Sequence, residues 1–336
     1  MSWNGIDAAG TAEWVLLRDA RITKQCKRGT FSLYLVNNNN DVYRLLLENS
    51  NATADSSLTE NGIVNFSLIK DLNAQISFNG FSIKYVFSGV ENYKVNGNKF
   101  KVNKGEYLLG NRFSEGKVDI GSKEFVKGVC IDIKPSILSE VVGSFLEPGT
   151  SVSDLNLDKF FTSGDFFENK YPHDKTNLGQ MLCELGKIIN NNPYANYEFN
   201  KEFFYTLSEK IVLDHQPILS QLNSIKSLKS ITKKDLYRKV LKGREFLDNN
   251  YLSKIEIAAV AKEANISEYH FYRLFKSIFN ISPLQYIIAR RLEIAKQLLK
   301  NKALNLTDIA VITGFSDMHS LSKAFKKHYG VSPSKI

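Results

Sequence analysis

The first 150 residues alternate short apolar runs with turn residues. Runs rich in β-branched and aromatic residues are separated by pairs such as Asn61-Gly62 and Asn96-Gly97, a pattern typical of strands joined by tight turns. Between residues 95 and 111, strand-like pieces and Asn/Gly turns follow each other closely, as in a meander or small barrel. The expected strands include Phe31–Val36, Val64–Ile69, Ile76–Phe87 and Phe125–Ile133. We therefore expect a barrel over about residues 25–135.

The pattern changes from strand to helix after Pro135. Apolar residues recur at helical spacing over Leu178–Ile189, and the same helical pattern continues through Phe199–Leu213 to about Leu228. Helices are therefore expected over about residues 176–228. Residues 146–175 show neither period and receive no assignment. Barrel and helices together would form a first domain over residues 1–230.

A second, all-α domain is expected over residues 231–336. Thr232 and Asp235 have the spacing of a helix start, and the helix that follows would stop at Asn249-Asn250. Nearly everything beyond it has helical periodicity. The predicted fold class is α+β multidomain: an N-terminal β-rich, barrel-like domain with following helices, then an all-α domain.

This C-terminal domain contains an internal repeat. Val260–Pro283 and Ile309–Pro333 share an Ala, an apolar-Ser pair, a Phe-Lys pair and a Ser-Pro pair at nearly constant offset. Each copy has the form of a helix-turn-helix, over residues 255–279 and 306–329. A helix from Leu284 to about Lys300 would join them, with Leu284, Ile287, Leu292, Ala295 and Leu299 on its buried side.

The residue types within each copy fit their expected positions. Asn265 and Gly314 occupy the turns, where a left-handed backbone is needed. Ser267 and Ser316 are expected to cap the second helix of each copy. The expected buried stripes are Phe271, Leu274, Phe275 and Ile278 in the first copy and Leu321, Ala324 and Phe325 in the second. The side chains left for solvent or a ligand are Tyr269, His270, Tyr272, Arg273 and Lys276, and then Met318, His319, Ser322, Lys323 and Lys326.

Charge separates the two domains more clearly than composition does. The net charge of +9 is concentrated in residues 233–336, which hold 19 Lys and Arg against 9 Asp and Glu. A basic domain beside a neutral one suits a polyanion-binding module, although a solvated lysine-rich surface would give the same count. The longest apolar runs are far too short for a membrane span, and no secretory signal is visible. Cys26, Cys130 and Cys183 lie far apart in sequence, which argues against disulfides and structural zinc and favours a cytoplasmic location.

Residues from about 235 to 336 resemble the DNA-binding domain of the AraC/XylS family of transcription regulators. The resemblance covers both half-motifs, their spacing, the linking helix and the run GFSD…AFKKHYGVSP. It implies seven helices, with two recognition helices entering adjacent major-groove segments. It also implies base contacts by Tyr269, Tyr272 and Arg273 and by Met318, His319 and Lys323.

Two residues depart from the family pattern. Asn265 stands where glycine is usual, and Lys323 stands where arginine is common, which replaces a bidentate guanine contact by a point charge. For Arg290-Arg291 we expect phosphate contacts or intramolecular ion pairs rather than base readout. For Lys326-Lys327 phosphate contact and plain solvation are both open.

The resemblance implies that the first domain senses a ligand, mediates dimerisation, or both. Its strand rhythm looks like the cupin-type sensor barrels of some family members. All five histidines lie outside residues 1–150, so no metal-dependent barrel chemistry and no cofactor is expected. Double-stranded DNA is the expected partner. RNA polymerase, an unidentified small-molecule effector and a second copy of the chain are further candidates, and no membrane is expected.

Two other functions compete with a transcription regulator. An enzyme fused to the DNA-binding unit would need an activated nucleophile, and neither GxSxG nor HExxH nor a P-loop occurs. Cys130 is expected to be a buried strand residue, and no catalytic residue is assigned. A nonspecific architectural binder would explain the basic charge but not two separately patterned recognition helices.

Overall fold

The computed structural model describes residues 31–36, 42–48, 60–78, 80–145, 152–191, 199–227, 229–300 and 304–335. Cys26 lies outside these ranges. The chain divides into two compact units, Met1–Gln216 and Pro217–Ile336. The division falls within the helix α4 (Lys201–Asn223), and each unit is described by itself below.

The first unit contains one sheet, to which all nine strands of the described residues belong. Its longest members, β3 (Gly62–Ser77) and β8 (Glu115–Ile133), pair antiparallel along almost their whole length. The other strands are β1 (Phe31–Val36), β2 (Val42–Glu48), β4 (Phe81–Ser88), β5 (Val90–Val95), β6 (Asn98–Asn103), β7 (Glu106–Gly110) and β9 (Asn169–Pro172).

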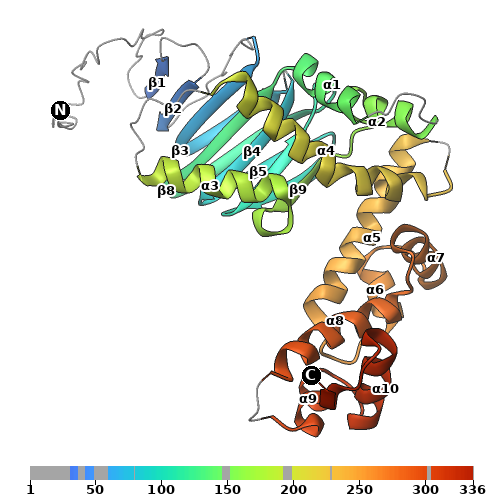
Figure 1. Ribbon diagram of the computed structural model, residues 1–336. Helices are drawn as coiled ribbons and strands as arrows, with labels where there is room; N and C mark the ends of the chain where they lie inside the picture. The colour runs from blue at the N-terminus through green and yellow to red at the C-terminus, as the bar shows by residue number, and fades with distance from the viewer. Residues whose placement is uncertain are drawn as a thin grey trace. The chain divides into compact units, whose positions relative to one another are not determined.

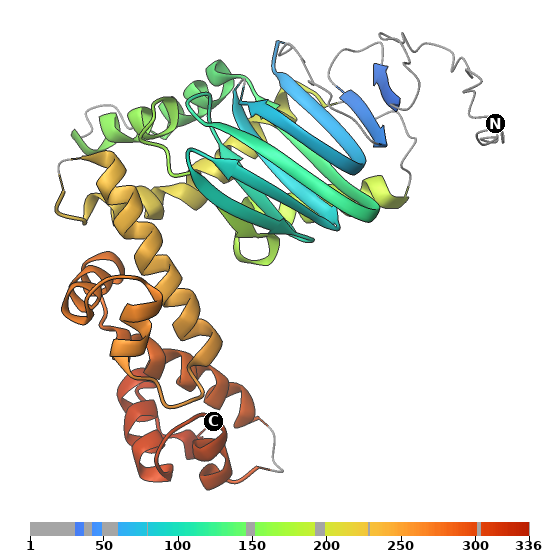
Figure 2. The same ribbon diagram turned by 180° about the vertical axis from the view of Figure 1, so that it is seen from behind.

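The long β3–β8 ribbon lets the sheet curl. One end of β8 pairs with β4, which continues to β7 and β9, whereas the other end pairs with β5, which continues to β6. The two branches bend towards each other and give the nearly closed, mostly antiparallel barrel seen in Figure 2. This confirms the barrel-like fold expected for the N-terminal part.

Alternation along the strands gives the barrel an inside and an outside. Inward-facing side chains such as Val86, Leu108 and Val126 form an apolar core with their neighbours. Outward-facing Phe81 stacks edge-on against Phe166, with 4.8 Å between the ring centroids. The helices that follow therefore complete a second apolar layer.

Helices α3 (Asn177–Asn191) and α4 cross one face of the sheet (Figures 1 and 2). Gly186 of α3 lies so close to Phe87 that an added Cβ would be 2.7 Å from its ring. The described chain also forms α1 (Pro135–Ser144) and α2 (Val152–Thr162). Residues 146–175, unassigned from sequence, therefore contain α2, β9 and the 3₁₀ turn η1 (His173–Lys175).

The turn chemistry predicted from sequence is visible in the strands. Asn96 and Gly97 join β5 to β6 and both have positive φ, 46° and 82°. Two such residues in succession give the hairpin turn whose twist matches paired strands. The Asn-Gly pair therefore fixes the register between Val95 and Asn98.

The regular elements of the second unit, among its described residues, are all helices. It contains α5 (Ser230–Asn250), α6 (Ile257–Glu263), α7 (Glu268–Phe279), α8 (Pro283–Leu298), α9 (Leu306–Ile312), α10 (Met318–Tyr329) and the short turn η2 (Pro333–Lys335). Leu292 and Ala295 of α8 pack with Ile309, Leu321 and Phe325 into one core. In the part of the chain that the structure describes, no helix is both long and apolar enough to cross a membrane.

Candidate nucleic-acid interface

The two repeat copies fold into matching helix-turn-helix units. In the first, α6 and α7 are joined by a turn in which Asn265 has a φ of 53° and Ile266 N–H donates to the carbonyl of Ala261 at 3.1 Å. In the second, Gly314 has a φ of 76° and Phe315 N–H donates to the carbonyl of Ala310 at 2.9 Å. Asn265 therefore adopts the same left-handed conformation as Gly314, a conformation that asparagine tolerates better than most residues.

The buried stripes lie where the periodicity placed them. In the first copy the side chains of Phe271, Leu274, Phe275 and Ile278 are buried in α7. In the second copy Leu321 and Phe325 are fully buried, with Ala324 packed at the edge of their cluster. The opposite face of each second helix is consequently free of the core.

The caps of the two recognition helices differ from each other. Ser267 caps α7 as predicted, because its hydroxyl oxygen accepts from His270 N–H. The prediction for Ser316 is wrong: Asp317 is the N-cap of α10 and accepts from Ser320 N–H at 2.7 Å. Ser316 instead donates to the Asp317 carboxylate at 2.8 Å. These bonds lower the pKa of Asp317 to about 2.

The first recognition helix presents two tyrosines and an arginine to solvent. Tyr269 is 70% exposed and Tyr272 is 42% exposed, unusual for such large side chains. The Arg273 guanidinium lies over the Tyr269 ring, 5.6 Å from its centroid. The six residues predicted for this helix, Ser267, Tyr269, His270, Tyr272, Arg273 and Lys276, are all exposed.

The second recognition helix carries a smaller and more polar set. Met318, His319, Lys323 and Lys326 are exposed on α10, together with Ser316 just before it, whereas Ser322 is half-buried. His328 and Lys327 add exposed polar groups near its C-terminal end. The predicted residues thus lie in two groups on matching helices of one repeat.

Arg291 has a role that the sequence did not reveal. From α8 its guanidinium donates to three backbone carbonyls: Tyr251 at 2.6 Å, Gly314 at 2.6 Å and Ser253 at 2.8 Å. Tyr251 and Ser253 follow α5, whereas Gly314 is the turn of the second helix-turn-helix unit. Arg291 therefore fastens that turn to the loop between α5 and α6, which precedes the first helix-turn-helix. We call these three bonds the Arg291 clasp. Each guanidinium nitrogen makes one of these bonds, so three of the five N–H groups of Arg291 are already used within the domain.

Arg290 forms intramolecular ion pairs, one of the two alternatives expected for it from the sequence. It pairs with Glu293 at 2.5 Å and with Asp248 at 3.5 Å. The linking helix departs from its predicted stripe at one position, because Leu284 is 59% exposed, although Ile287, Leu292 and Ala295 are buried. Leu284 lies in the first turn of α8, where Ser282 and Gln285 form a capping box and the neighbouring Pro283 is the residue that is buried.

Two exposed apolar residues lie outside the set that the sequence predicts for the recognition surface. Val311 and Ile312 of α9 are 68% and 45% exposed. At the corresponding positions of the first copy stand Lys262 and Glu263. A comparison of the two copies is therefore the sequence signal that predicts exposure of this apolar pair. Among the described residues, no cluster of three or more His, Cys, Asp or Glu could hold a metal ion.

Residues 260–336 match the family model for a helix-turn-helix domain. The chain is 37% identical over 90 residues to the probable transcriptional regulator LumQ of Photobacterium leiognathi, covering 27% of this chain and 36% of that protein. It is 30% identical over 165 residues to the lactose operon transcription activator of Staphylococcus xylosus, covering 48% and 54%. The matches thus span between a third and about half of these relatives' own length.

Solved structures are similar at lower identity. The DNA-binding domain of AdpA in complex with a target DNA is 24% identical, with 29% of this chain and 87% of that chain covered and a TM-score of 0.28. Unsaturated fatty acid bound ToxT from Vibrio cholerae is 14% identical, with 83% and 95% covered and a TM-score of 0.35.

The repeat geometry, the match to the family model and the sequence relatives agree on one identity for the C-terminal part. The chain carries the double helix-turn-helix DNA-binding domain of the AraC/XylS family.

Proposed function

We propose that this protein is a sequence-specific transcription regulator whose two recognition helices, α7 and α10, read adjacent major-groove segments. The observation that carries the proposal is the pair of matched units, each with one helix whose outer face is exposed and rich in polar side chains, joined in α7 by two exposed tyrosines. A helix presented in this way fits the major groove, where each base pair shows a distinct pattern of donors and acceptors. Both relatives described above are named as transcription regulators.

The two recognition helices would contribute differently. Arg273 offers a planar, bidentate donor, and the Tyr269 ring beneath its guanidinium limits its freedom before binding. Lys323 offers a single point charge in α10. We therefore assign sharper base readout to α7, and to α10 a larger share of apolar contact through Met318 and of polar contact through His319 and Ser322.

Lysines at the edges of both helices would hold the DNA backbone. Lys276 of α7 and Lys326 of α10 are exposed, lie towards the C-terminal ends of their helices and form no ion pair among the described residues. Contacts from such residues orient a protein on the duplex without reading its sequence. They also make affinity fall with salt, because bound counterions are released.

The first unit would modulate this binding. The barrel with its helices is separate and compact, as a sensor or dimerisation module requires. The name of the Staphylococcus xylosus relative supports transcription activation, for which RNA polymerase would be a further partner. Binding of a small-molecule effector by the first unit, and dimerisation with a second copy of the chain, are part of the same proposal.

Selection of bound sequences from a random DNA pool by the full-length protein tests the proposal. Two short specific blocks about one helical turn apart, roughly 10 bp, are expected. Salt-sensitive binding with no enriched sequence, and a specificity ratio near one in direct competition, would indicate a nonspecific architectural binder instead.

A further inference from the structure

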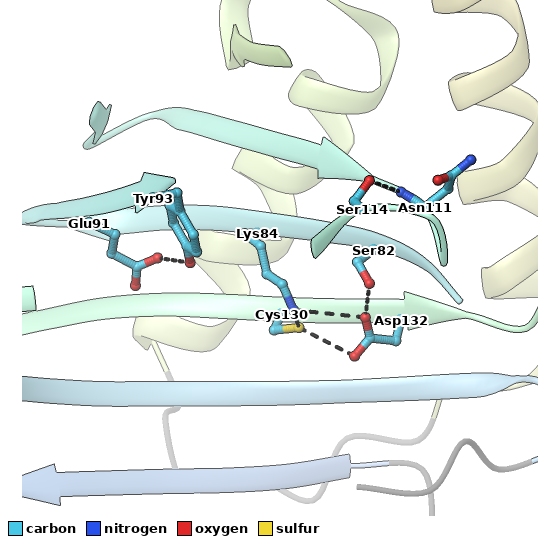
Figure 3. A network of polar contacts seen from close by, with 8 residues as sticks. All are labelled: Ser82, Lys84, Glu91, Tyr93, Asn111, Ser114, Cys130 and Asp132. Atoms are coloured by element: carbon cyan, nitrogen blue, oxygen red, sulfur yellow. Dashed lines mark hydrogen bonds and ion pairs between the residues drawn. The ribbon is translucent and has the colours of Figure 1, made fainter. Parts of the chain in front are cut away.

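A group of polar side chains lies on the inner face of the barrel, where β4 and β8 pair. Lys84 stands directly opposite Cys130, and Ser82 stands directly opposite Asp132. Because alternate residues of a strand share a face, these four side chains point to the same side as Val86 and Val126 of the inner core. Figure 3 shows them converging, and we call them the Lys84 cluster.

The contacts within the Lys84 cluster are unusual for a buried ion pair. Lys84 Nζ is 3.8 Å from Asp132 Oδ1, and it donates a hydrogen bond to Cys130 Sγ. Cys130 Sγ is in turn 3.4 Å from Asp132 Oδ2, and the Ser82 hydroxyl donates to Asp132. Sulfur is a weak acceptor, so the ammonium group is placed against the poorer of its two partners.

The surroundings keep this nitrogen and sulfur together. Only 12% of the Lys84 side chain and 9% of the Asp132 side chain are exposed. Burial lowers the pKa of Lys84, but Asp132 and Cys130 raise it, and the net pKa lies above the usual value. Burial, with Asp132, raises the pKa of the Cys130 thiol to about 12. The reduced pair is therefore an ammonium group beside a thiol, screened from bulky reagents, with Asp132 as an adjacent proton acceptor.

We propose that Lys84 and Cys130 form an oxidative modification site, at which a peroxide joins Lys84 Nζ covalently to Cys130 Sγ. Hydrogen peroxide is small and neutral enough to reach a partly buried thiol, and Cys130 retains intermediate exposure. Oxidation to a sulfenic acid followed by condensation with a nearby nitrogen is established chemistry for cysteine. Here the only bond rotations needed are those of two side chains already in contact.

The two steps balance with one equivalent of peroxide. First, the thiol S–H and the peroxide O–O bonds break, the sulfur loses two electrons, and sulfenic acid and one water form. Second, Lys84 gives one proton to the Asp132 carboxylate, its nitrogen attacks the sulfur, and the S–O bond breaks as the S–N bond forms. The hydroxyl group leaves with a second proton of the nitrogen as another water. A thiol reductant would reverse the link by attacking the sulfur.

The cross-link would fasten the two strands that organise the barrel. β8 pairs with β3, β4 and β5, so a covalent bond from Cys130 to β4 would restrain the centre of the sheet. The residues enclosed between positions 84 and 130 would lose freedom in the unfolded state, as in a disulfide loop. Oxidation is therefore expected to raise the unfolding temperature of the first unit, by roughly 10 °C.

Mass spectrometry of the full chain, before and after hydrogen peroxide, tests the site. The expected product is one peptide pair joined through Lys84 and Cys130, with the mass of two hydrogens lost and restored by dithiothreitol. A joined pair that retains one added oxygen would support the same site, with the sulfur of the S–N link oxidised by a second equivalent of peroxide that leaves as water. Cys130 recovered unjoined, whether as thiol, sulfenic acid or sulfinic acid, would overturn the proposal, as would a link from Cys130 to another cysteine.

Two variants separate the cross-link from general oxidation. Lys84→Arg keeps the positive charge beside Asp132 but removes the primary amine, so the joined pair should disappear while other oxidation products persist. Cys183→Ser removes the other described thiol and should leave the joined pair unchanged. Loss of the pair in Cys183→Ser, or its persistence in Lys84→Arg, would contradict the assignment, and the wild-type mass measurement decides the matter even if a variant fails to fold.

Discussion

Arg273 is the residue whose replacement should show sequence readout most directly. Its guanidinium is exposed, planar and held over Tyr269, and a bidentate contact to guanine is worth about 1–3 kcal/mol of discrimination. Arg273→Ala should weaken binding to the selected site by this amount and relax preference at one position, while binding to random DNA changes little. Competition binding on the two DNAs measures both.

Two exposed lysines serve as controls for Arg273. Lys276→Ala should weaken selected and random DNA alike and lower the salt slope by about 1. Lys254→Ala, exposed and outside both recognition helices, should change neither affinity. If Arg273→Ala behaved like Lys276→Ala, Arg273 would be a phosphate contact.

His215 is a neutral histidine enclosed in the first unit. Only 1% of it is exposed, and the rings of Phe161, Phe166 and Tyr171 surround it, with centroid distances of 5.2–6.2 Å. Its Nδ1 bonds to the carbonyl of Ile211 at 2.8 Å. Burial lowers the pKa of His215 to about 4, although that carbonyl and Asp214 act in the opposite direction.

This burial makes the stability of the first unit depend on pH. The unfolded chain binds a proton near pH 6.5 and the folded chain only near pH 4, so the free energy of unfolding falls as pH is lowered through this window. The loss should amount to about 3 kcal/mol by pH 4. Urea denaturation at pH 7 and pH 4.5 should show it, and His215→Phe, which suits the aromatic surroundings, should remove most of the difference. An equal loss in His215→Phe would assign the effect to other groups.

Among the elements, the linking helix α8 acts through the Arg291 clasp. Lysine at position 291 lacks the planar fork that reaches all three carbonyls at once, and each lost bond costs about 1 kcal/mol. Arg291→Lys should therefore lower the unfolding temperature of the second unit. It should also weaken binding to a two-block site more than binding to either block alone, because the spacing of the helices is less fixed.

Arg290 provides the matched control for the clasp. It is adjacent in sequence and charged, but its partners are the side chains of Glu293 and Asp248 near the surface. Arg290→Lys can keep these pairs and should leave the ratio of two-block to one-block affinity unchanged. The same ratio in Arg291→Lys as in the wild type would show that the clasp stabilises the fold without setting the spacing.

The start of α10 offers a test of its cap. Asp317→Ala removes the acceptor for Ser320 N–H, whereas Ser316→Ala removes only a bond to the Asp317 carboxylate. The unfolding temperature of the second unit should fall more in Asp317→Ala than in Ser316→Ala. Because the pKa of Asp317 is lowered to about 2, the contribution of the cap should be full above pH 4 and disappear towards pH 2. The reverse order of the two variants would restore Ser316 as the cap.

These elements show what the sequence could and could not predict. The stripe of Phe271, Phe275, Leu321 and Phe325 follows from local periodicity, because neighbouring turns of one helix must face the same core. Asp317 rather than Ser316 is the N-cap of α10 because the turn of the second copy has one more residue than that of the first. Serine and aspartate can both cap a helix, so the residue type alone does not distinguish them. The Arg291 clasp depends on carbonyls that lie 23 and 40 residues away, which no local pattern encodes. Cys130 was expected as a buried strand residue, but its contact with Lys84 required the pairing of β4 with β8.

For the whole molecule, the division of charge matches the division of structure. The positive excess lies in residues 233–336, within the unit that holds both recognition helices, and the barrel has a separate core of its own. Two cores in two compact units are consistent with a DNA-binding part that functions when separated from the barrel.

The beginning of that part can be tested by comparing two fragments. The helical periodicity predicts a domain that starts at residue 231, whereas the second compact unit starts at Pro217. Leu222 and Ile225 are 5% and 2% exposed. Tyr237 donates to the Gln221 side chain, and the Ser277 hydroxyl donates to the carbonyl of Ser224 at 2.9 Å. The segment before residue 231 therefore packs against α5 and α7.

Fragment 217–336 should consequently be more stable than fragment 231–336, by about 3–5 kcal/mol if both apolar side chains lose their burial. Thermal unfolding and DNA binding of the two fragments measure the difference. Leu222→Ala with Ile225→Ala in the longer fragment should reproduce most of the loss without shortening the chain. Equal unfolding temperatures for the two fragments would mean that the DNA-binding domain starts at residue 231 and that residues 217–230 only connect it to the barrel.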